Sequence, residues 1–304
     1  MNVLVIGAAK TGTTIVSKTI RNGIIDADYH MEPQDSRFFM HESVPGDRSH
    51  VVKIIFEHWD ERPNLRKAIV LNELPFKFDK IIFIVRDPRD EILSRVMYFM
   101  YPWVSEHRLD GNEERVRRWI AFIRKVEQEP VLYSFQEIIE FLGKNFSSGV
   151  GLSRKTQALK LYRDFMLSVG EQVYVLKYED FIQSEWQGLE SYLGFPLSIK
   201  SDSRQQHHRT RRSSSFNNWK ELFKPVDVDF FRKEWGDIML AQGYTDWELE
   251  PVPHLSSDNY SGYLERLLDE LSTDQAKPIS SSLQESNLSV LQRKSKSLFG
   301  FLRN

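Results

Sequence analysis

The sequence predicts an α/β fold in three layers, with a central parallel sheet between helices on both faces. Two observations indicate this fold. Largely apolar runs at residues 3–6, 50–56, 80–85 and 173–176 are typical of strands that are covered on both faces. Helix-like patterns separate these runs, and strands that alternate with helices are joined by right-handed crossovers into a parallel sheet.

The composition supports a globular chain and limits its chemistry. Of 304 residues, 40% are hydrophobic and 28% are charged, so the chain can bury a sizeable core. The net charge is -2, which predicts no nucleic-acid partner and requires any anion site to be built locally. The chain has no cysteine, which excludes disulfides, thiolate metal sites and a cysteine nucleophile.

The sequence shows no membrane-spanning or targeting segment. It has no run of about 18 apolar residues, which a transmembrane helix requires. The apolar start is too short for a signal peptide and lacks a basic leader. We therefore expect a soluble, cytoplasmic protein.

The first elements follow in order from the N-terminus. Residues 3–6 are the first strand, and residues 13–21 form a helix that Asn22 and Gly23 would end. A second short strand is expected at Ile24 and Ile25. A polar, irregular stretch then continues to the strand at residues 50–56.

The middle of the chain is predicted to be mostly helical. The strand at 80–85 ends in a charged stretch, where Asp87 is suited to cap a helix and Pro88 to its first turn. Residues 102–170 have mostly amphipathic helical patterns. One of these helices carries a basic face, made of Arg115, Arg117, Arg118, Arg124 and Lys125.

The last strand, 173–176, is followed by a helix that ends near Gly194, and another helix runs from Pro225 to about Ala241. Beyond Glu250 serine, proline and polar residues dominate. We therefore predict one domain over 1–248 and a polar tail over 249–304 that is partly helical or disordered. The apolar and basic end of this tail is a candidate for weak membrane-surface contact, for packing on the domain, or for disorder.

The loop Gly-Ala-Ala-Lys-Thr-Gly-Thr-Thr at residues 7–14 joins the first strand to the first helix. Small residues allow the backbone to approach a ligand, and a helix N-terminus attracts anions. The glycine spacing is that of a nucleotide-binding P-loop, but Thr13 stands at the position of its lysine, and the loop lysine is Lys10. A triphosphate site would lack its main charge. The alternative is a tight turn without a ligand.

A second motif follows the strand at 80–85, where the sequence reads Arg86-Asp-Pro-Arg-Asp and continues into a helix with Ser94 eight residues after Arg86. An arginine at the carboxyl end of a strand can grip a phosphate through two hydrogen bonds. Ligands bind at this end of the strands in open α/β sheets. The alternative is a capped helix whose arginines pair with Asp87 and Asp90 on a solvated face.

The two motifs together resemble those of sulfotransferases that use 3′-phosphoadenosine 5′-phosphosulfate (PAPS). The first resembles the family's 5′-phosphosulfate loop, commonly Pro-Lys-Ser-Gly-Thr-Thr, with Ala9 in place of the proline. The second resembles its 3′-phosphate motif. The resemblance implies the P-loop-like sulfotransferase architecture, a PAPS donor that leaves as 3′-phosphoadenosine 5′-phosphate (PAP), and no metal. It implies cofactor contacts from the loop residues and the second motif: Ala9, Lys10, Thr11, Gly12, Thr13, Thr14, Arg86 and Ser94.

Later segments extend the resemblance over about residues 1–248. The strand-end sequence Tyr178-Glu-Asp resembles the place where the family's tyrosine approaches the adenosine. The basic stretch with Arg209, Arg211 and Arg212 resembles a loop that closes over the 3′-phosphate, although the family's Arg-Lys-Gly wording is absent. The sequence does not decide which of these three arginines acts.

Sulfuryl transfer requires positioning, charge neutralisation and a base that accepts the proton of the acceptor hydroxyl. Lys10 is expected to neutralise charge in the loop, and Lys53 to add charge near the leaving oxygen. The family uses a histidine after the second strand or a glutamate after the first helix. The candidates here are Glu32 first, His58 second and Glu57 third.

The predicted function is sulfuryl transfer from PAPS to a hydroxyl, with a glycan or glycolipid as the expected acceptor. The glycan expectation rests on the sequence around Glu32, which resembles the Glu-x-x-Phe-Phe stretch of the family's carbohydrate-acting branch, and on the basic helix. A small-molecule acceptor remains open. The alternatives are a P-loop kinase and a cofactor-binding protein without a catalytic base.

Overall fold

The computed structural model describes residues 1–41, 48–107, 111–146, 151–170, 173–198 and 216–275. The chain divides into two compact units. The first comprises Met1–Asp87 with Gln157–His207, and the second comprises Pro88–Thr156 with His208–Asn304. The first unit contains the sheet and most of the sequence-predicted site residues.

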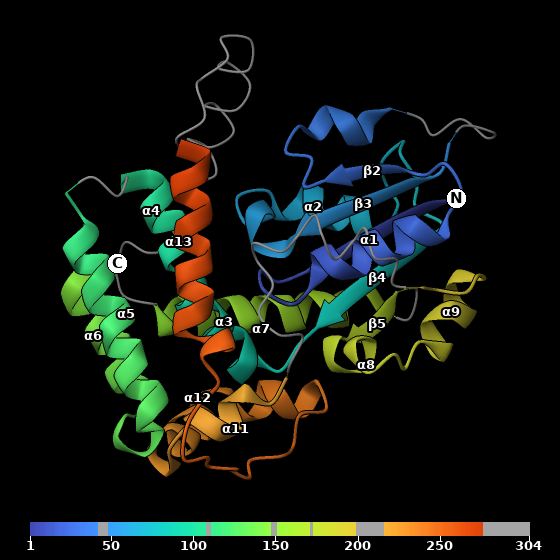
Figure 1. The fold of residues 1–304 in the computed structure, drawn as a ribbon. Coiled ribbons are helices and arrows are strands. Elements are labelled where there is room, and N and C mark those ends of the chain that lie inside the picture. Colours follow the sequence, from blue (N-terminus) through green and yellow to red (C-terminus); the bar gives the residue numbers. More distant parts are fainter. Residues whose placement is uncertain (42–47, 108–110, 147–150, 171–172, 199–215, 276–304) are drawn as a thin grey trace. The chain divides into compact units, whose positions relative to one another are not determined.

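The sheet of the first unit has five parallel strands in the order β2-β3-β1-β4-β5 (Figure 1). This arrangement confirms the predicted fold class. The first strand of the chain, β1, lies at the centre of the sheet between β3 and β4. The strands are β1 (Asn2–Gly7), β2 (Asp28–Met31), β3 (His50–Ile55), β4 (Lys80–Val85) and β5 (Tyr174–Lys177).

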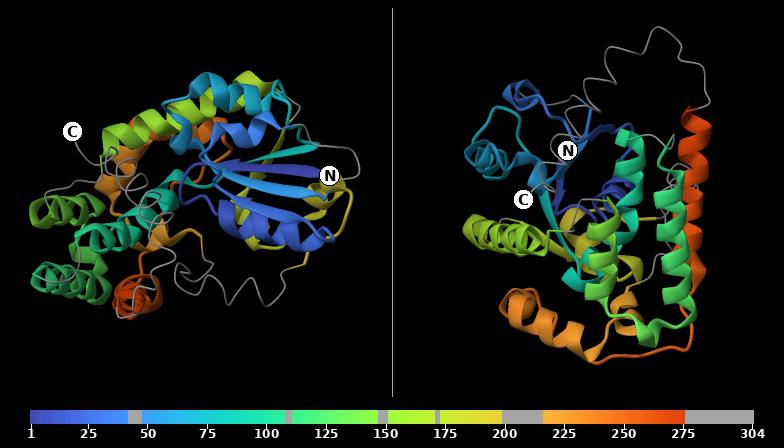
Figure 2. Two further views of the ribbon diagram at one scale, coloured as in Figure 1. Left: turned by 90° about the horizontal axis from the view of Figure 1, so that it is seen from above. Right: turned by 90° about the vertical axis from the view of Figure 1, so that its left-hand side faces the viewer.

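Helices cover both faces of this sheet, as Figure 2 shows from above. The α7 helix begins in the second unit and continues into the first at Gln157. The helical segments are α1 (Thr13–Gly23), η1 (Ser36–Met40), η2 (Phe56–Trp59), α2 (Pro63–Val70), α7 (Leu152–Val169), α8 (Tyr178–Ile182) and α9 (Gln187–Leu193).

Two cores explain why the strands are apolar throughout. Alternate side chains of a strand point to opposite faces. Leu4 and Ile6 of β1 therefore pack with residues of α2 and α7, whereas Val3 and Val5 pack with residues of α1 and α9. All four side chains are fully buried. The central strand is thus fixed from both sides, and the loop that follows it starts from a rigid support.

The prediction of a strand at Ile24 and Ile25 is wrong. Ile25 is 89% exposed, and Ile24 is the C-cap residue of α1. The strand lies a few residues later, at Asp28–Met31, on the edge of the sheet. Its residues are half-buried or exposed, so it lacks the apolar run by which the other strands can be found in the sequence.

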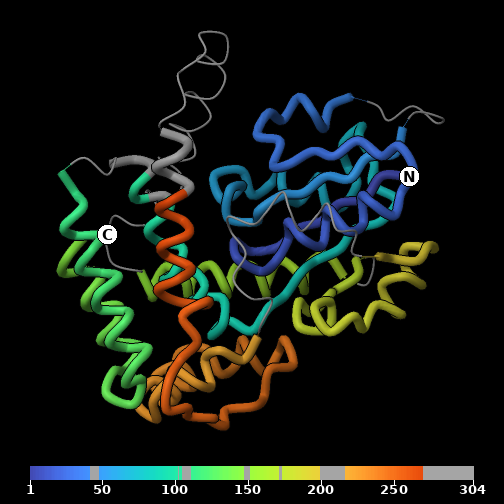
Figure 3. Tube along the Cα trace, viewed as in Figure 1, coloured from blue at the N-terminus to red at the C-terminus, as the bar shows by residue number. Residues whose placement is uncertain are grey.

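The second unit is helical, and Figure 3 traces its chain. In it α13 packs against α4 and α5, with Tyr263, Leu264 and Leu267 buried. The polar segment after Glu250 therefore includes a packed helix. The helices are α3 (Pro88–Tyr98), α4 (Met100–His107), α5 (Glu113–Gln128), η3 (Pro130–Leu132), α6 (Phe135–Phe146), α11 (Asn218–Leu222), α12 (Pro225–Ala241), η6 (Ser257–Asn259) and α13 (Ser261–Gln275).

Across the described ranges, every helix is too short or too polar to span a lipid bilayer. The basic and apolar end of the chain, residues 288–302, lies outside the described residues.

Candidate functional site

The loop between β1 and α1 is a tight turn with a defined set of backbone bonds. The Thr11 hydroxyl donates to the Ala8 carbonyl oxygen at 2.8 Å, and the Thr11 amide donates to the same oxygen at 3.3 Å. The α1 helix starts after Gly12, whose carbonyl accepts the first helical bond from Val16 at 3.2 Å. The loop thus has a fixed shape that its own residues maintain.

Both glycines of the loop are required by close approaches. A Cβ atom at Gly7 would lie 2.6 Å from the Thr11 hydroxyl oxygen. A Cβ at Gly12 would lie 2.3 Å from the Tyr178 ring, and Gly12 also has a φ of 87°. Glycine adopts this left-handed conformation without the steric penalty of other residues. Tyr178, which follows β5 in the Tyr-Glu-Asp sequence, therefore packs directly against the loop.

The start of α1 is suited to an anion. The first N–H groups of a helix have no partner within it, and its dipole places partial positive charge there. The N-cap residue is Gly12, so no side chain caps this end. Lys10 adds a full positive charge two residues before the N-cap. This combination of amides and an ammonium group fits a phosphate or sulfate group.

Arg86 leaves the end of β4 and reaches the same loop. One of its terminal nitrogens donates to the Lys10 carbonyl oxygen at 3.0 Å. Its guanidinium carbon lies 4.6 Å from the centroid of the Tyr178 ring, a cation–π distance. Its Nε is buried and has no hydrogen-bond partner among the described residues. Arg86 therefore joins the two predicted motifs and retains a buried donor for an anion.

The charged residues that follow Arg86 are buried, so they do not form a solvated face. Asp87 is only 3% exposed, and its amide donates a hydrogen bond to the Glu179 carboxylate at 3.0 Å. In the second unit, Arg89 lies 3.5 Å from the centroid of the Trp219 ring, and Asp90 accepts the amide of Trp219 at 3.3 Å. These contacts lie within each unit and stabilise its fold.

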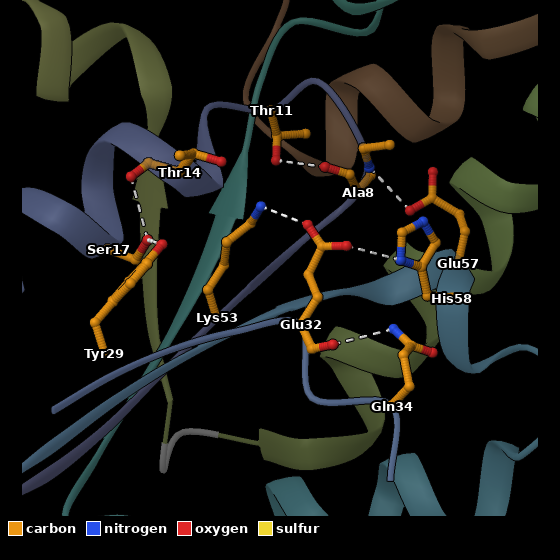
Figure 4. A network of polar contacts seen from close by, with 11 residues as sticks. Ala8, Thr11, Thr14, Ser17, Tyr29, Glu32, Gln34, Lys53, Glu57 and His58 are labelled. Atoms are coloured by element: carbon orange, nitrogen blue, oxygen red, sulfur yellow. Dashed lines mark hydrogen bonds and ion pairs between the residues drawn. The ribbon is translucent and has the colours of Figure 1, made fainter. Parts of the chain in front are cut away.

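A second group of charged side chains lies at the ends of β2 and β3 (Figure 4). Lys53 Nζ donates to Glu32 Oε1 at 2.7 Å, and His58 Nδ1 lies 3.2 Å from Glu32 Oε2. The Lys53 side chain is 5% exposed, that of Glu32 is 12% exposed, and that of His58 is 15% exposed. Parallel pairing of Met31 with Lys53 brings Glu32 next to the lysine.

The surroundings of Glu32 decide its charge. Burial alone would raise the pKa of Glu32, but the hydrogen bond from His58 and the charge of Lys53 outweigh burial and hold the pKa well below its usual range. The carboxylate is therefore ionised and can only accept hydrogen bonds. It follows that Nδ1 of His58 carries a proton. In the neutral ring Nε2 is then an acceptor.

Further polar groups lie around this ionised pair. The Ser17 hydroxyl and the Tyr29 hydroxyl lie 2.9 Å apart, and Ser17 donates to the Thr14 carbonyl oxygen at 3.2 Å (Figure 4). Burial and then the charge of Lys53 lower the pKa of Lys18 on α1. Lys18 is therefore a second ammonium group within electrostatic range of Lys53. Polar groups thus reach from the ends of β2 and β3 to the first turns of α1, and the charge of Lys53 acts on Lys18 there.

Sequence reasoning missed the connection that Glu57 makes. Glu57 Oε2 accepts the amide of Ala9 at 2.9 Å, so a residue considered as a third candidate base contacts the loop instead (Figure 4). The signal was present at Ala9, which stands where the resembled motif has proline. Alanine has an N–H that proline lacks, and a partly buried N–H requires an acceptor.

The structure brings together many of the predicted site residues in the first unit: Ala9, Lys10, Thr11, Gly12, Thr13, Thr14, Glu32, Lys53, His58, Arg86 and Tyr178. Ser94 is buried in α3 of the second unit. The candidate arginines Arg209, Arg211 and Arg212 lie outside the described residues.

Comparison with known proteins gives a similarity of fold. No protein-family model and no curated protein matches the chain. Among solved structures, it is similar to mouse sulfotransferase SULT7A1 complexed with PAP, with 15% identity, a TM-score of 0.41, and coverage of 80% of this chain and 86% of that chain.

It is also similar to retinol dehydratase in complex with androsterone and inactive cofactor PAP, with 11% identity, a TM-score of 0.38, and coverage of 78% and 80% of the two chains. A complex of retinol dehydratase with retinol and PAP gives 12% identity, a TM-score of 0.37, and coverage of 78% and 81%. At these identities the similarity concerns the fold alone.

Proposed function

We propose that this protein transfers a sulfuryl group from PAPS to a hydroxyl group of an acceptor. The observation that carries the proposal is the hydrogen bond from Arg86 to the Lys10 carbonyl oxygen. It joins the loop that resembles a phosphosulfate site to the motif that resembles a 3′-phosphate site. The two motifs follow β1 and β4, which are paired strands of one parallel sheet. They therefore lie at the carboxyl ends of the strands, where such sheets bind ligands.

The donor would be held by the loop and by Arg86. When bound, PAPS supplies an activated sulfuryl group, and PAP is its leaving group. Lys10, the amides at the start of α1, and the hydroxyls of Thr13 and Thr14 would bind the anionic end. The buried Nε of Arg86 would donate to the other phosphate. These residues fit the charge of the donor, because each offers a donor or a positive charge and none is acidic.

We assign the base to His58 and a positioning role to Glu32, which reverses the order expected from the sequence. Both oxygens of Glu32 are engaged, one with Lys53 and one with His58, and its lowered pKa makes it a weak base. Glu32 instead holds the proton on Nδ1 of His58. Nε2 is then the acceptor for the hydroxyl proton of the substrate.

For the acceptor we propose a hydroxyl of a glycan or glycolipid. The support is the sequence around Glu32 and the basic face of α5, whose residues Arg115, Arg117, Arg118, Arg124 and Lys125 are all exposed. The phenylalanines near Glu32 contribute to the core: Phe39 is fully buried and Phe38 packs against the same cluster. They support the fold around Glu32, so sugar contacts must come from other residues.

The proposal is tested by transfer of labelled sulfate from PAPS to a panel of glycans, glycolipids and small phenols. We expect label in at least one acceptor hydroxyl with wild-type protein. Lys10→Ala is expected to lower the rate by at least about a hundredfold, because removing one group that stabilises transition-state charge has effects of this size. PAP binding without transfer to any acceptor would identify a binding protein. Stabilisation by ATP with Mg²⁺, and none by PAP, would contradict the proposal.

A further inference from the structure

Lys10 has a backbone conformation that lysine seldom adopts. Its φ is 73°, in the left-handed region, where the Cβ atom of an L-residue meets its own backbone. Glycine would occupy this region without strain, but the sequence has a lysine there. Strained positions persist only where the surrounding structure imposes them. The loop must therefore contain contacts that fix the backbone at Lys10.

Two charged side chains provide such contacts, one on each side of Lys10. Glu57 Oε2 accepts the amide of Ala9 at 2.9 Å, and Arg86 donates to the carbonyl oxygen of Lys10 at 3.0 Å. Charge-assisted hydrogen bonds of this kind are stronger than those between neutral groups. We call Glu57 and Arg86 the Lys10 clamp.

The fold gives the clamp rigid supports. Glu57 lies in η2, directly after β3, and Arg86 directly follows β4. β3 and β4 are the two neighbours of β1 in the sheet, so the clamp reaches the loop from both sides of the strand that carries it. Glu57 and Arg86 are 8% and 9% exposed, which limits the freedom of both side chains.

We propose that Glu57 is a positioning residue, which holds Lys10 in its left-handed conformation and so directs the loop toward the anion. This inference rests on the proposed function only for what the anion is. Glu57 is also the neighbour of His58 in η2. One short turn of the chain therefore positions both the loop lysine, through Glu57, and His58, the proposed base, so a shift of this turn would move both groups.

The test compares Glu57→Ala, Glu57→Gln and the control Glu61→Ala. Glu61 is an exposed acid shortly after the same turn. With Glu57→Ala we expect exchange of the Ala9 amide hydrogen to accelerate roughly tenfold or more, and PAP to bind roughly tenfold more weakly, as loss of a hydrogen bond to a charged group implies. Glu57→Gln retains an acceptor oxygen, so it should recover most of the protection of the Ala9 amide and most of the affinity for PAP. Glu61→Ala should change neither.

A second pair of variants tests the conformational argument. Glycine adopts a φ of 73° without strain. In a Lys10→Gly background, the clamp is therefore less necessary to hold residue 10 in the left-handed conformation. Glu57→Ala should then accelerate amide exchange in the loop less than it does in the wild type. Equal acceleration in both backgrounds would overturn the proposal. If Glu57→Ala does not fold, the same comparison is made with Glu57→Met, which fills the volume without an acceptor.

The readouts separate this inference from the proposed function. Amide exchange is measured on the protein without ligand and needs no knowledge of the substrate. Faster exchange in Glu57→Ala, with rescue by Gln, supports the clamp even if PAP does not bind the wild-type protein, in which case the proposed function fails by itself. Unchanged exchange of the loop amides in Glu57→Ala overturns the clamp whatever PAP does.

Discussion

Replacing His58 by alanine is expected to lower kcat for sulfuryl transfer by roughly two to four orders of magnitude, the usual contribution of a general base. Nε2 of His58 is the acceptor that the ionised Glu32 leaves available, because Nδ1 carries the proton toward Glu32 at 3.2 Å. In the proposed role the histidine accepts a proton and does not bind the donor, so the affinity for PAP should change little. Initial rates with labelled PAPS and titration with PAP measure the two effects separately.

Chemical rescue distinguishes a base from a structural residue. Added imidazole should restore part of the activity of His58→Ala, because a small base can enter the space left by the side chain. His41→Ala is a suitable control, since His41 is exposed and lies outside the network of Figure 4. A His58→Ala variant that folds and retains wild-type kcat would remove the base assignment.

Replacing Glu32 by glutamine is expected to lower the free energy of unfolding by about 3 kcal/mol, the size found when one partner of a buried ion pair is removed. Lys53 is 4% exposed and would lose its carboxylate partner at 2.7 Å. The double variant Glu32→Gln with Lys53→Met removes both charges and should recover most of the loss. Urea denaturation at neutral pH measures all three proteins, with the exposed Glu61→Gln as a control.

The pH dependence of this difference follows from the lowered pKa of Glu32. A carboxyl whose pKa is lower in the folded protein adds stability above its unfolded pKa of about 4.3, and this contribution is lost as the pH falls below that value. Glutamine does not titrate. The difference in unfolding free energy between wild type and Glu32→Gln should therefore be largest at neutral pH. It should decrease progressively as the pH is lowered from about 5 to about 3. A gap that is constant over this range would contradict the ionised state of Glu32.

Much of the fold can be predicted from the sequence, because the signals are local. The strand at Lys80–Val85 is an apolar run with a clear end, and the helix at Pro225–Ala241 starts at a proline. The edge strand at Asp28–Met31 could not be found in the same way. Its side chains are only partly buried, so its formation depends on pairing with β3 and leaves no hydrophobic pattern.

The candidate site shows a similar division between local and long-range information. Gly7, Lys10 and Gly12 occur in one short loop, so the tight turn before the first helix and the proposal of an anion site there both follow from the loop sequence. The pair of Glu32 and Lys53 is separated by 21 residues and depends on strand register, which the sequence does not display. The contact of Glu57 with Ala9 depends on where η2 turns after β3. Such contacts become visible only once the strands are placed.

The most direct test of the proposed donor site is a calorimetric titration of the 304-residue chain with PAP, and in parallel with ATP and Mg²⁺. We expect PAP to bind one site per chain and ATP with Mg²⁺ to bind more weakly. We also expect Lys10→Ala and Arg86→Ala each to weaken PAP binding by roughly tenfold or more, because each removes a charged hydrogen-bond donor to a phosphate group of PAP. Wild-type protein that binds ATP with Mg²⁺ and does not bind PAP would contradict the proposed function.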